Sequence, residues 1–238
     1  MSAGMLLRWG TRLALGAALA AALAAGLVWL AQRPRFDFQR IEVVGDLRHV
    51  SRAALRAAIA GRLHGNFFTM HLAEARSAFE AIPWVAAASV RRVWPGCLVV
   101  TLVERRAVGV WSDGRVVSDA GQLFDVNPAE AELDGPQVEF SGPPALAAEA
   151  VRKLASLDAA LQPLPATIAA IDISERASWS VRTLAGQTLD LGRDDPPGSV
   201  QARLNAIVAN YPLVVAQLSG PPAHIDARYN NGFAATRQ

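Results

Sequence analysis

The sequence predicts an α+β protein with a single N-terminal transmembrane helix and two domains behind it. Three observations support this prediction. Residues 13–31 are apolar and uncharged, residues 36–105 follow the order strand, helix, helix, strand, strand, and residues 106–238 show short alternating strands between turn signals. The chain has 238 residues, 52% of them hydrophobic, and a mean hydropathy of +0.21. That composition excludes a disordered chain, which needs low hydrophobicity and high net charge.

Residues 13–31 are nineteen side chains without a charge or a polar group. As a helix they span roughly 28 Å, close to the hydrocarbon thickness of a bilayer. The alternative is a cleaved signal peptide, but its apolar part runs about 7–15 residues. We therefore expect an uncleaved anchor. The short tail, residues 1–12, is expected to stay inside and the long remainder to lie outside. In a bacterial cell this would be a single-pass, type II inner-membrane protein with its N-terminus in the cytoplasm and its bulk in the periplasm.

The formal charge of +2 conceals an asymmetry between segments. Residues 1–32 carry two arginines and no acidic residue, residues 33–106 twelve arginines and six acidic residues, and residues 107–238 nine basic and fifteen acidic residues. The segment charges of +2, +6 and −6 indicate separate modules, and we expect no nucleic-acid partner. Cys97 is the single cysteine, which excludes an internal disulfide and a thiolate metal site.

The first module begins with a strand at residues 41–44. Ser51 is a good N-cap for a helix over residues 52–63, in which apolar residues recur every four positions. A second helix over residues 71–82 ends before Pro83, because the residue before a proline avoids helical geometry. Two strands follow at residues 85–93 and 97–104, joined by the turn at residues 94–96. We expect the two helices to cover one face of a three-stranded sheet.

The second module, residues 106–238, is predicted to be mainly antiparallel sheet with helices. Its clearest signal is the hairpin turn Ser112-Asp113-Gly114. Residues 126–136 are polar and acidic and predict a loop. The remaining predicted strands are residues 108–111, 115–118, 122–124, 137–140, 168–173, 179–184, 188–191, 225–229 and 232–235, and the predicted helices are residues 143–161 and 199–210.

Motifs for catalysis and metal binding are missing from the sequence. Nucleophile-elbow, zinc-protease and phosphate-loop patterns do not occur, and the four histidines share no ligand spacing. We expect no catalytic residue, no metal and no cofactor. Asp194-Asp195 is interpreted as a helix cap. Arg91-Arg92 is either a structural pair with Glu104 across the hairpin or part of a docking face.

Several short motifs occur in order along the part of the chain that follows the apolar stretch. The motifs are Ile41-Glu-Val-Val-Gly45, Asn66-Phe67-Phe68, Ile82-Pro-Trp-Val85, Val90-Arg-Arg-Val-Trp-Pro95 with Leu98, Val103-Glu104, Trp111, Val117-Ser-Asp-Ala-Gly121, Leu123-Phe124, Leu191-Gly192-Arg193 and Asp226-Ala-Arg-Tyr-Asn-Asn-Gly232. Together with the anchor, this ordered set covers almost the whole chain and resembles the FtsQ/DivIB family of bitopic bacterial cell-division proteins.

The resemblance implies a POTRA domain at residues 36–105, a following β domain and no catalysis. It implies a scaffold that links early and late division proteins at the septum and regulates peptidoglycan synthesis. The implied partners are FtsB and FtsL, and less directly FtsK, FtsW, FtsI and FtsN. Trp84, Trp94, Pro95 and Glu104 are expected to be structural.

The family binds FtsB by strand addition to the last strand of the β domain, which is plausible because an edge strand offers unpaired backbone groups. Tyr229 is the expected aromatic anchor, Gly232 allows close backbone approach, and Arg228 and Arg176 pair with acidic residues of the partner. The alternative for Tyr229 is a core aromatic. The residues carried over for this site are Arg176, Arg228, Tyr229, Asn231, Gly232, Phe233 and Ala234.

Two further expectations follow from the resemblance. The POTRA surface used for recruitment corresponds to Val90 and Arg92. Some members have a tryptophan shortly after the last strand, where this chain has Thr236-Arg237-Gln238, so an aromatic contribution is missing there. The competing functions are a membrane-anchored periplasmic cell-wall enzyme, which needs a nucleophile or metal cluster, and a POTRA-type translocation component, which needs a barrel or repeated POTRA modules.

Overall fold

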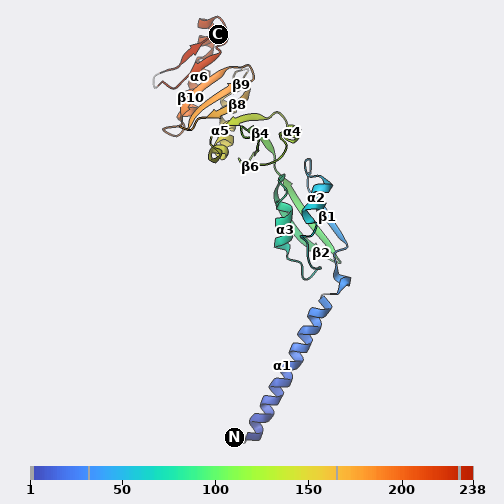
Figure 1. Cartoon of the computed structure of the whole chain (residues 1–238). Helices are drawn as coiled ribbons and strands as arrows, with labels where there is room; N and C mark the ends of the chain where they lie inside the picture. Colours follow the sequence, from blue (N-terminus) through green and yellow to red (C-terminus); the bar gives the residue numbers. More distant parts are fainter. Residues whose placement is uncertain (1–2, 32, 165, 230–231, 238) are drawn as a thin grey trace. The chain divides into compact units, whose positions relative to one another are not determined.

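The computed structural model describes residues 3–31, 33–164, 166–229 and 232–237. The chain divides into two compact units, one ending at Glu104 and the other beginning at Arg105 (Figure 1). Each unit combines helices with a β-sheet, so the predicted α+β class is confirmed.

The first unit is a long N-terminal helix followed by a small sheet with helices. The strand order is β1-β3-β2, with β1 parallel and β2 antiparallel to the central β3. A parallel pair needs a long crossover, which α2 and α3 provide, and this explains the predicted β-α-α-β-β order. The elements are α1 (Ala3–Ala31), η1 (Pro34–Phe36), β1 (Arg40–Val44), α2 (Arg52–Ile59), α3 (Leu72–Glu80), β2 (Val85–Val93) and β3 (Cys97–Glu104).

Helix α1 begins ten residues before the predicted apolar stretch, at Ala3. Alanine, leucine, methionine and arginine are strong helix formers, so the helix continues through the basic N-terminal side of that stretch. The section Arg12–Ala31 is long and apolar enough to cross a membrane, and none of it is buried within the described protein. An apolar helix outside a protein core is typical of a membrane span.

The core of the first unit lies on one face of β3. Leu98, Val100 and Leu102 alternate along this strand and are at most 2% exposed. Helix α3 packs on β2 and buries Ala75 and Phe79, while α2 packs against α3. The opposite face of β3 is also buried at Cys97 and Val99, so burial alternates with period two only in the second half of the strand.

Helix α2 is shorter than predicted, ending at Ile59 instead of residue 63. Its start is as predicted, because the Ser51 hydroxyl accepts a hydrogen bond from the N–H of Ala54 at 3.1 Å. The early end follows from Gly61, which adopts a left-handed φ of +69°. Glycine takes that conformation at little cost, and it ends a helix.

The predicted pairing of Arg91-Arg92 with Glu104 is wrong, because the β2–β3 register places them at opposite ends of the hairpin. Glu104 instead accepts hydrogen bonds from the N–H groups of Arg48 (2.8 Å) and Val50 (2.7 Å). Burial would raise the pKa of Glu104, but these N–H groups outweigh it and lower the pKa below its ordinary value. The carboxylate thus fixes the segment that leads into α2.

The second unit is built, within its described residues, on a nine-stranded sheet of order β12-β11-β10-β9-β8-β7-β4-β5-β6. The pairs β4–β7, β7–β8 and β10–β11 are parallel and the others antiparallel, so the sheet is mainly antiparallel, as predicted. The elements are β4 (Ala107–Trp111), β5 (Val116–Ser118), β6 (Leu123–Phe124), α4 (Pro128–Ala131), η2 (Glu132–Asp134), β7 (Val138–Ser141), η3 (Pro144–Leu146), α5 (Ala147–Leu161), β8 (Ile168–Ile173), β9 (Ser178–Thr183), β10 (Thr188–Arg193), α6 (Ser199–Leu218), β11 (His224–Asp226) and β12 (Ala234–Thr236).

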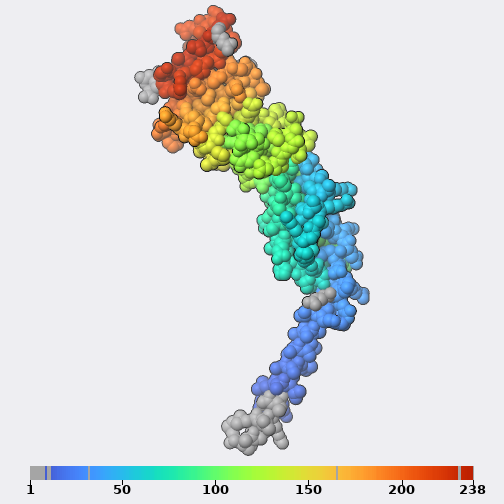
Figure 2. All heavy atoms as spheres, viewed as in Figure 1, coloured from blue at the N-terminus to red at the C-terminus, as the bar shows by residue number. Residues whose placement is uncertain are grey.

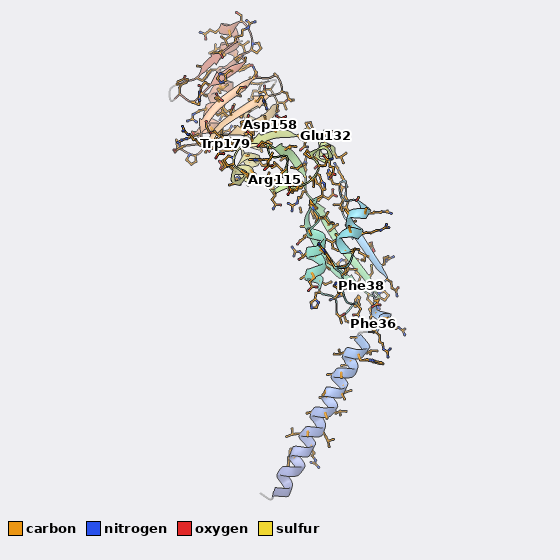
Figure 3. All side chains as sticks on the ribbon, in the orientation of Figure 1. Phe36, Phe38, Arg115, Glu132, Asp158 and Trp179 are labelled. Carbon is orange, nitrogen blue, oxygen red and sulfur yellow. The ribbon has the colours of Figure 1, made fainter. Side chains whose placement is uncertain are left out.

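Helices α5 and α6 pack against each other and form a common core with the sheet. Trp111 and Phe140 stack with ring centroids 6.0 Å apart, and Trp179, labelled in Figure 3, is 2% exposed. Leu157 of α5 and Leu204 of α6 complete the contact and are at most 1% exposed. This packing holds the strands β8 to β11 in place and thereby fixes the loops at their ends.

Asp194 caps α6, as the sequence indicated. One carboxylate oxygen accepts a hydrogen bond from the N–H of Val200 at 3.0 Å, and the other binds the Lys153 ammonium of α5. Burial would raise the pKa of Asp194, but the ammonium and the backbone N–H outweigh it and lower the pKa. The cap therefore also ties α5 to the start of α6.

Two predictions in the second unit are wrong. Residues 126–136 are not a plain loop, since the Asn127 side chain accepts a hydrogen bond from the N–H of Ala129 and Pro128 opens the short helix α4. Helix α6 does not stop at Asn210 but continues to Leu218 with Pro212 inside it. Its end is set by Ser219, whose left-handed φ of 52° terminates the helix.

The last predicted strands are also shorter than expected. Strand β11 ends at Asp226 instead of residue 229, because the Asp226 carboxylate accepts a hydrogen bond from the N–H of Arg228 at 3.0 Å and turns the chain. Strand β12 begins at Ala234 instead of residue 232. Residues 227–229 and 232–233, which the structure describes between these two strands, are therefore not part of a strand.

Candidate functional site

The C-terminal strands form one edge of the nine-stranded sheet. Strand β11 pairs in parallel with β10, and β12 pairs antiparallel with β11 through Asp226↔Ala234 and His224↔Thr236. Among the described strands β12 is the outermost, so the far side of its backbone has no strand beside it. An edge of this kind can add a strand from another chain. Figure 2 shows the red C-terminal residues at the surface of this unit.

Arg228 is held by a two-pronged ion pair with Asp226. Its Nε donates to Asp226 Oδ1 at 2.8 Å and its Nη2 to Oδ2 at 2.6 Å. The guanidinium lowers the pKa of Asp226 to about 2 and, in return, the pKa of Arg228 is raised. The carboxylate is mostly covered while the Arg228 side chain is 58% exposed. The pair thus fixes the guanidinium at the surface, with its remaining N–H donors pointing elsewhere.

A basic hollow of about 470 Å³ lies beside this ion pair. It combines the β8–β9 turn, the end of β10, the first turns of α6 and the segment after β11. The domain as a whole carries a net charge of −6, so this basic surface is a local exception. The hollow is lined by Ser174, Arg176, Ser178, Gly192, Arg193, Asp195, Arg203 and Arg228.

Tyr229 is 61% exposed and lies next to Arg228 in the connection between β11 and β12. The alternative that it is a core aromatic is therefore wrong. Phe233 and Ala235 are half-buried and pack against the core of the unit. The β11–β12 hairpin is thus anchored from inside while its tyrosine is presented outside.

Comparison with known proteins identifies this architecture. The family model described as POTRA domain, FtsQ-type, matches residues 36–105. The model described as cell division protein FtsQ/DivIB, C-terminal, matches residues 109–228. The chain belongs to the FtsQ/DivIB family. The sequence-based resemblance is therefore confirmed, and so is the POTRA fold of the first unit.

Relatives of the FtsQ/DivIB family match over most of this chain. Cell division protein FtsQ of Burkholderia pseudomallei is 41% identical over 211 residues, which cover 89% of this chain and 84% of the relative. Cell division protein FtsQ of Bordetella pertussis is 38% identical over 91% of this chain and 85% of the relative. Both matches therefore cover about nine tenths of this chain.

The structure corrects the placement of the FtsQ-type partner site in the last strand. Arg228 and Tyr229 lie before β12, and Ala234 is in it. Asn231 lies outside the described residues. Gly232 is exposed with open space around it, so the chain itself makes no close backbone approach there. Arg176, 52 positions before Arg228, lines the same hollow as Arg228.

Arg203 of this hollow was not singled out from the sequence, and Arg193 entered only as part of a family motif. Arg203 donates from Nη1 to the carbonyl oxygens of Leu191 (2.6 Å) and Arg193 (2.7 Å), which holds the end of β10 against α6. Gly192 makes room for this arrangement, since a Cβ there would lie 3.3 Å from Arg228 Cγ and its φ is +73°. The Leu191-Gly192-Arg193 motif was the available signal.

The residues expected on the POTRA recruitment face lie in the first unit, on β2. Val90 and Arg92 share the face of the strand that also carries buried Ala88. Both are half-buried, and the Arg92 guanidinium donates to the carbonyl oxygen of Met70. Arg92 thereby has a structural contact, tying β2 to the segment before α3.

Three observations bear on metal binding and enzymatic chemistry. Across residues 3–31, 33–164, 166–229 and 232–237, no group of three histidine, cysteine or acidic side chains is placed to hold a metal ion. A larger hollow of about 1120 Å³ lies beside α5, near Asp158 in Figure 3. Its lining is largely apolar, with charges of both signs at Arg152, Arg182 and Glu139. The relatives are named as cell division proteins rather than enzymes.

Proposed function

We propose that this chain is a non-enzymatic division scaffold of the inner membrane. Its helix α1 anchors it with the N-terminus in the cytoplasm, and both units lie in the periplasm at the division septum. There it binds FtsB and FtsL and connects early and late division proteins to septal peptidoglycan synthesis. FtsK, FtsW, FtsI and FtsN are the less direct partners, and the POTRA face with Val90 and Arg92 serves recruitment.

The observation that carries the partner proposal is the exposed edge at β12 beside the arginine hollow. An extended segment of FtsB pairs with β12, because backbone N–H and C=O groups at an edge strand accept a further strand. The 61% exposed ring of Tyr229 lies at one end of this edge and supplies an aromatic contact. Backbone pairing with β12 provides the affinity, and contact with the Tyr229 ring fixes the register of the FtsB segment along β12.

Charge complementarity selects the partner segment. Four arginines and one aspartate line the hollow next to the edge, so an acidic segment is attracted and a basic one repelled. Arg228 already pairs with Asp226, which orients the guanidinium before binding and lowers the cost of ordering it. An acidic side chain of the partner then binds the outward N–H groups of Arg176 and Arg228.

The decisive experiment is capture of FtsB–FtsL by the full chain in lipid nanodiscs. Tyr229→Glu places a negative charge where the acidic segment docks and removes the ring. We expect the dissociation constant to rise at least about 30-fold, corresponding to about 2 kcal/mol. Leu184→Glu is the matched control, because Leu184 is similarly exposed (73%). Leu184 follows the C-terminal end of β9, whereas the arginine hollow lies at the N-terminal end of that strand.

The control variant should bind like the parent. Normal capture by a folded Tyr229→Glu variant would contradict the assigned site, whereas equal loss in both variants would point to a general charge effect. Folding of each variant is checked by its cooperative unfolding in urea. Muropeptide release by the purified chain would instead support a cell-wall enzyme.

A further inference from the structure

An aromatic cluster lies at the end of the first unit where β1 begins, and the partner site does not use it. Three segments meet there: the stretch after α1, the turn before α3 and the β2–β3 turn. Figure 3 shows Phe36 and Phe38 at this end of the unit. We name it the aromatic end, and it consists of Phe36, Phe38, Phe67, Phe68 and Trp94.

The rings of the aromatic end contact one another in a chain. Phe36 lies edge-on to Phe68 with centroids 5.0 Å apart, and Phe67 lies edge-on to Trp94 at 5.6 Å. Phe67 also contacts Phe38 at 6.0 Å. Edge-to-face geometry at these distances is favourable for aromatic pairs. The cluster is therefore an ordered surface and not a set of separate exposed rings.

Much of this apolar surface faces outward. The Trp94 side chain is 64% exposed and Phe68 is 52% exposed, while the other three rings are half-buried. The prediction that Trp94 is structural is therefore incomplete, because most of its surface is outside the protein. A contiguous exposed apolar patch marks a site where the surface meets a membrane or a partner.

The backbone under the rings is fixed by buried hydrogen bonds. Asn66 is 4% exposed, and its side-chain oxygen accepts from the N–H groups of Phe68 (3.0 Å) and Thr69 (3.1 Å). The N–H of Phe67 donates to the carbonyl oxygen of Phe36 at 2.8 Å. The Asn66 amide also donates to the carbonyl oxygen of Ala31, the last residue of α1. The Asn66-Phe67-Phe68 motif thus holds Phe68 outward and Phe67 half-buried on a hydrogen-bonded turn.

The position of the cluster in the chain identifies its occupant. Phe36 follows the end of α1 at Ala31 by five residues, which span at most roughly 17 Å when fully extended. Part of that stretch is the helical turn η1, which shortens the reach. If α1 spans the bilayer, the rings must lie within or next to the headgroup region, which is about 5–8 Å deep on each side.

The charges around the cluster fit a lipid surface. Arg33 lies over the Trp29 ring at 3.6 Å, and Arg35 and Arg40 are exposed on the same stretch of chain. The stretch also carries exposed Asp37, and Arg40 lies 3.8 Å from Glu42, so residues 33–40 hold three arginines and one acidic residue. Basic side chains next to exposed aromatics are typical of segments that lie in the interface of an anionic membrane. Exposed tryptophan is likewise favoured at the headgroup level.

We propose that the aromatic end inserts into the outer leaflet interface, with Trp94 and Phe68 as its deepest side chains. It holds the POTRA unit at a fixed height and orientation on the membrane. This inference rests on the proposed membrane anchor. The occupant is the lipid interface; a partner segment or a second copy of the chain is an alternative that the test must detect.

The test uses the full chain in nanodiscs whose lipids carry brominated acyl chains, which quench tryptophan on contact. The Trp9→Phe/Trp29→Phe variant removes the tryptophans of α1. Of the remaining four, Trp84, Trp111 and Trp179 are at most 4% exposed, so Trp94 is the reporter. We expect at least a twofold loss of the Trp94 emission, defined as the signal that Trp94→Phe removes from the same background.

Two controls separate the possible outcomes. In the chain that retains Trp29, bromine quenching of Trp29 reports insertion of α1 into the bilayer. If Trp29 is not quenched, the proposal that α1 is a membrane anchor is wrong. Trp29 quenching without Trp94 quenching overturns the aromatic-end proposal alone. Accessibility of Trp94 to aqueous acrylamide in the nanodisc would overturn it in the same way.

Two variants distinguish lipid from protein partners. Phe68→Asp should abolish the Trp94 quenching and leave FtsB–FtsL capture unchanged, whereas Tyr229→Glu should do the reverse. Loss of capture by Phe68→Asp, with no lipid quenching in the parent, would make the cluster a partner surface and overturn the proposal. Protection of Trp94 that depends on protein concentration would identify a second copy and overturn it as well.

Discussion

The aromatic end and the arginine hollow are two exposed surfaces built in opposite ways. In the first, outward rings are positioned by a buried polar residue, Asn66, that water does not reach. In the second, the exposed guanidinium of Arg228 is positioned by an ion pair with the mostly covered carboxylate of Asp226. The first surface offers mainly apolar ring area. The second keeps charged donors available and fits an acidic ligand.

This difference shows how two surfaces of one chain can favour different kinds of binding partner. An apolar surface gains free energy wherever water is removed from it, and a lipid interface does that without a specific partner. A charged surface gains little unless a complementary group arrives in the right geometry. The three changes below test this contrast, from the largest expected effect to the smallest.

Charge reversal at the hollow should have the largest effect. Arg228→Glu replaces the oriented guanidinium with a carboxylate beside Asp226, and it repels an acidic partner. We expect the dissociation constant for FtsB–FtsL to rise at least about 100-fold, near 3 kcal/mol, in a titration with the full chain. Arg152→Glu, the same reversal at an exposed position on α5, should change it less than about threefold.

Removal of the buried polar residue at the aromatic end should have an intermediate effect. Asn66→Ala leaves the N–H groups of Phe68 and Thr69 without their acceptor, at a cost of about 2 kcal/mol in the free energy of unfolding measured in urea. The lipid quenching of Trp94 should fall by about half. Asn127→Ala, which removes an exposed helix cap in the other unit, should leave the quenching unchanged.

Neutralising the carboxylate under Arg228 should have the smallest effect. Asp226→Asn keeps the shape but weakens the hold on the guanidinium, and we expect about fivefold weaker capture, near 1 kcal/mol. The guanidinium lowers the pKa of Asp226 from 3.8 to about 2, so the ion pair stabilises the fold above about pH 4. This contribution is lost as the pH falls from about 4 to about 2.

The variant therefore has a pH signature. Urea unfolding at a series of pH values should show the parent more stable at pH 5, with the difference shrinking toward pH 2. A constant difference over that range would show that Asp226 stabilises the fold by some other means than its charge.

Local patterns predicted much of this molecule correctly. The nineteen-residue apolar stretch predicted a helix, and alternation predicted β2 and β3 with their observed ends. The errors occurred where a single side chain overrides the pattern. Asp226 accepts the N–H of Arg228 and ends β11, and Gly61 ends α2. Propensity cannot weigh such contacts, because they depend on the conformation they help to create.

The family residues were a partial guide to the candidate site. They named Arg176 and Arg228, which line one hollow in the structure, but they placed Tyr229 in a strand that ends before it. They also left out Arg203, whose role depends on the carbonyl oxygens of β10. A motif names residue types and an order along the chain, and it carries no information on which main-chain atoms a side chain reaches.

By itself the sequence determined the apolar helix, the order of strands and helices, and the charges of the segments, because each depends on neighbours within a few residues. Only the tertiary structure decided that four arginines from separate segments line one hollow, and that Phe36, Phe67 and Trp94 form one surface. The physical reason is the register of strand pairs. Pairing fixes which distant residues become neighbours, and a shift of one residue would turn each side chain to the other face.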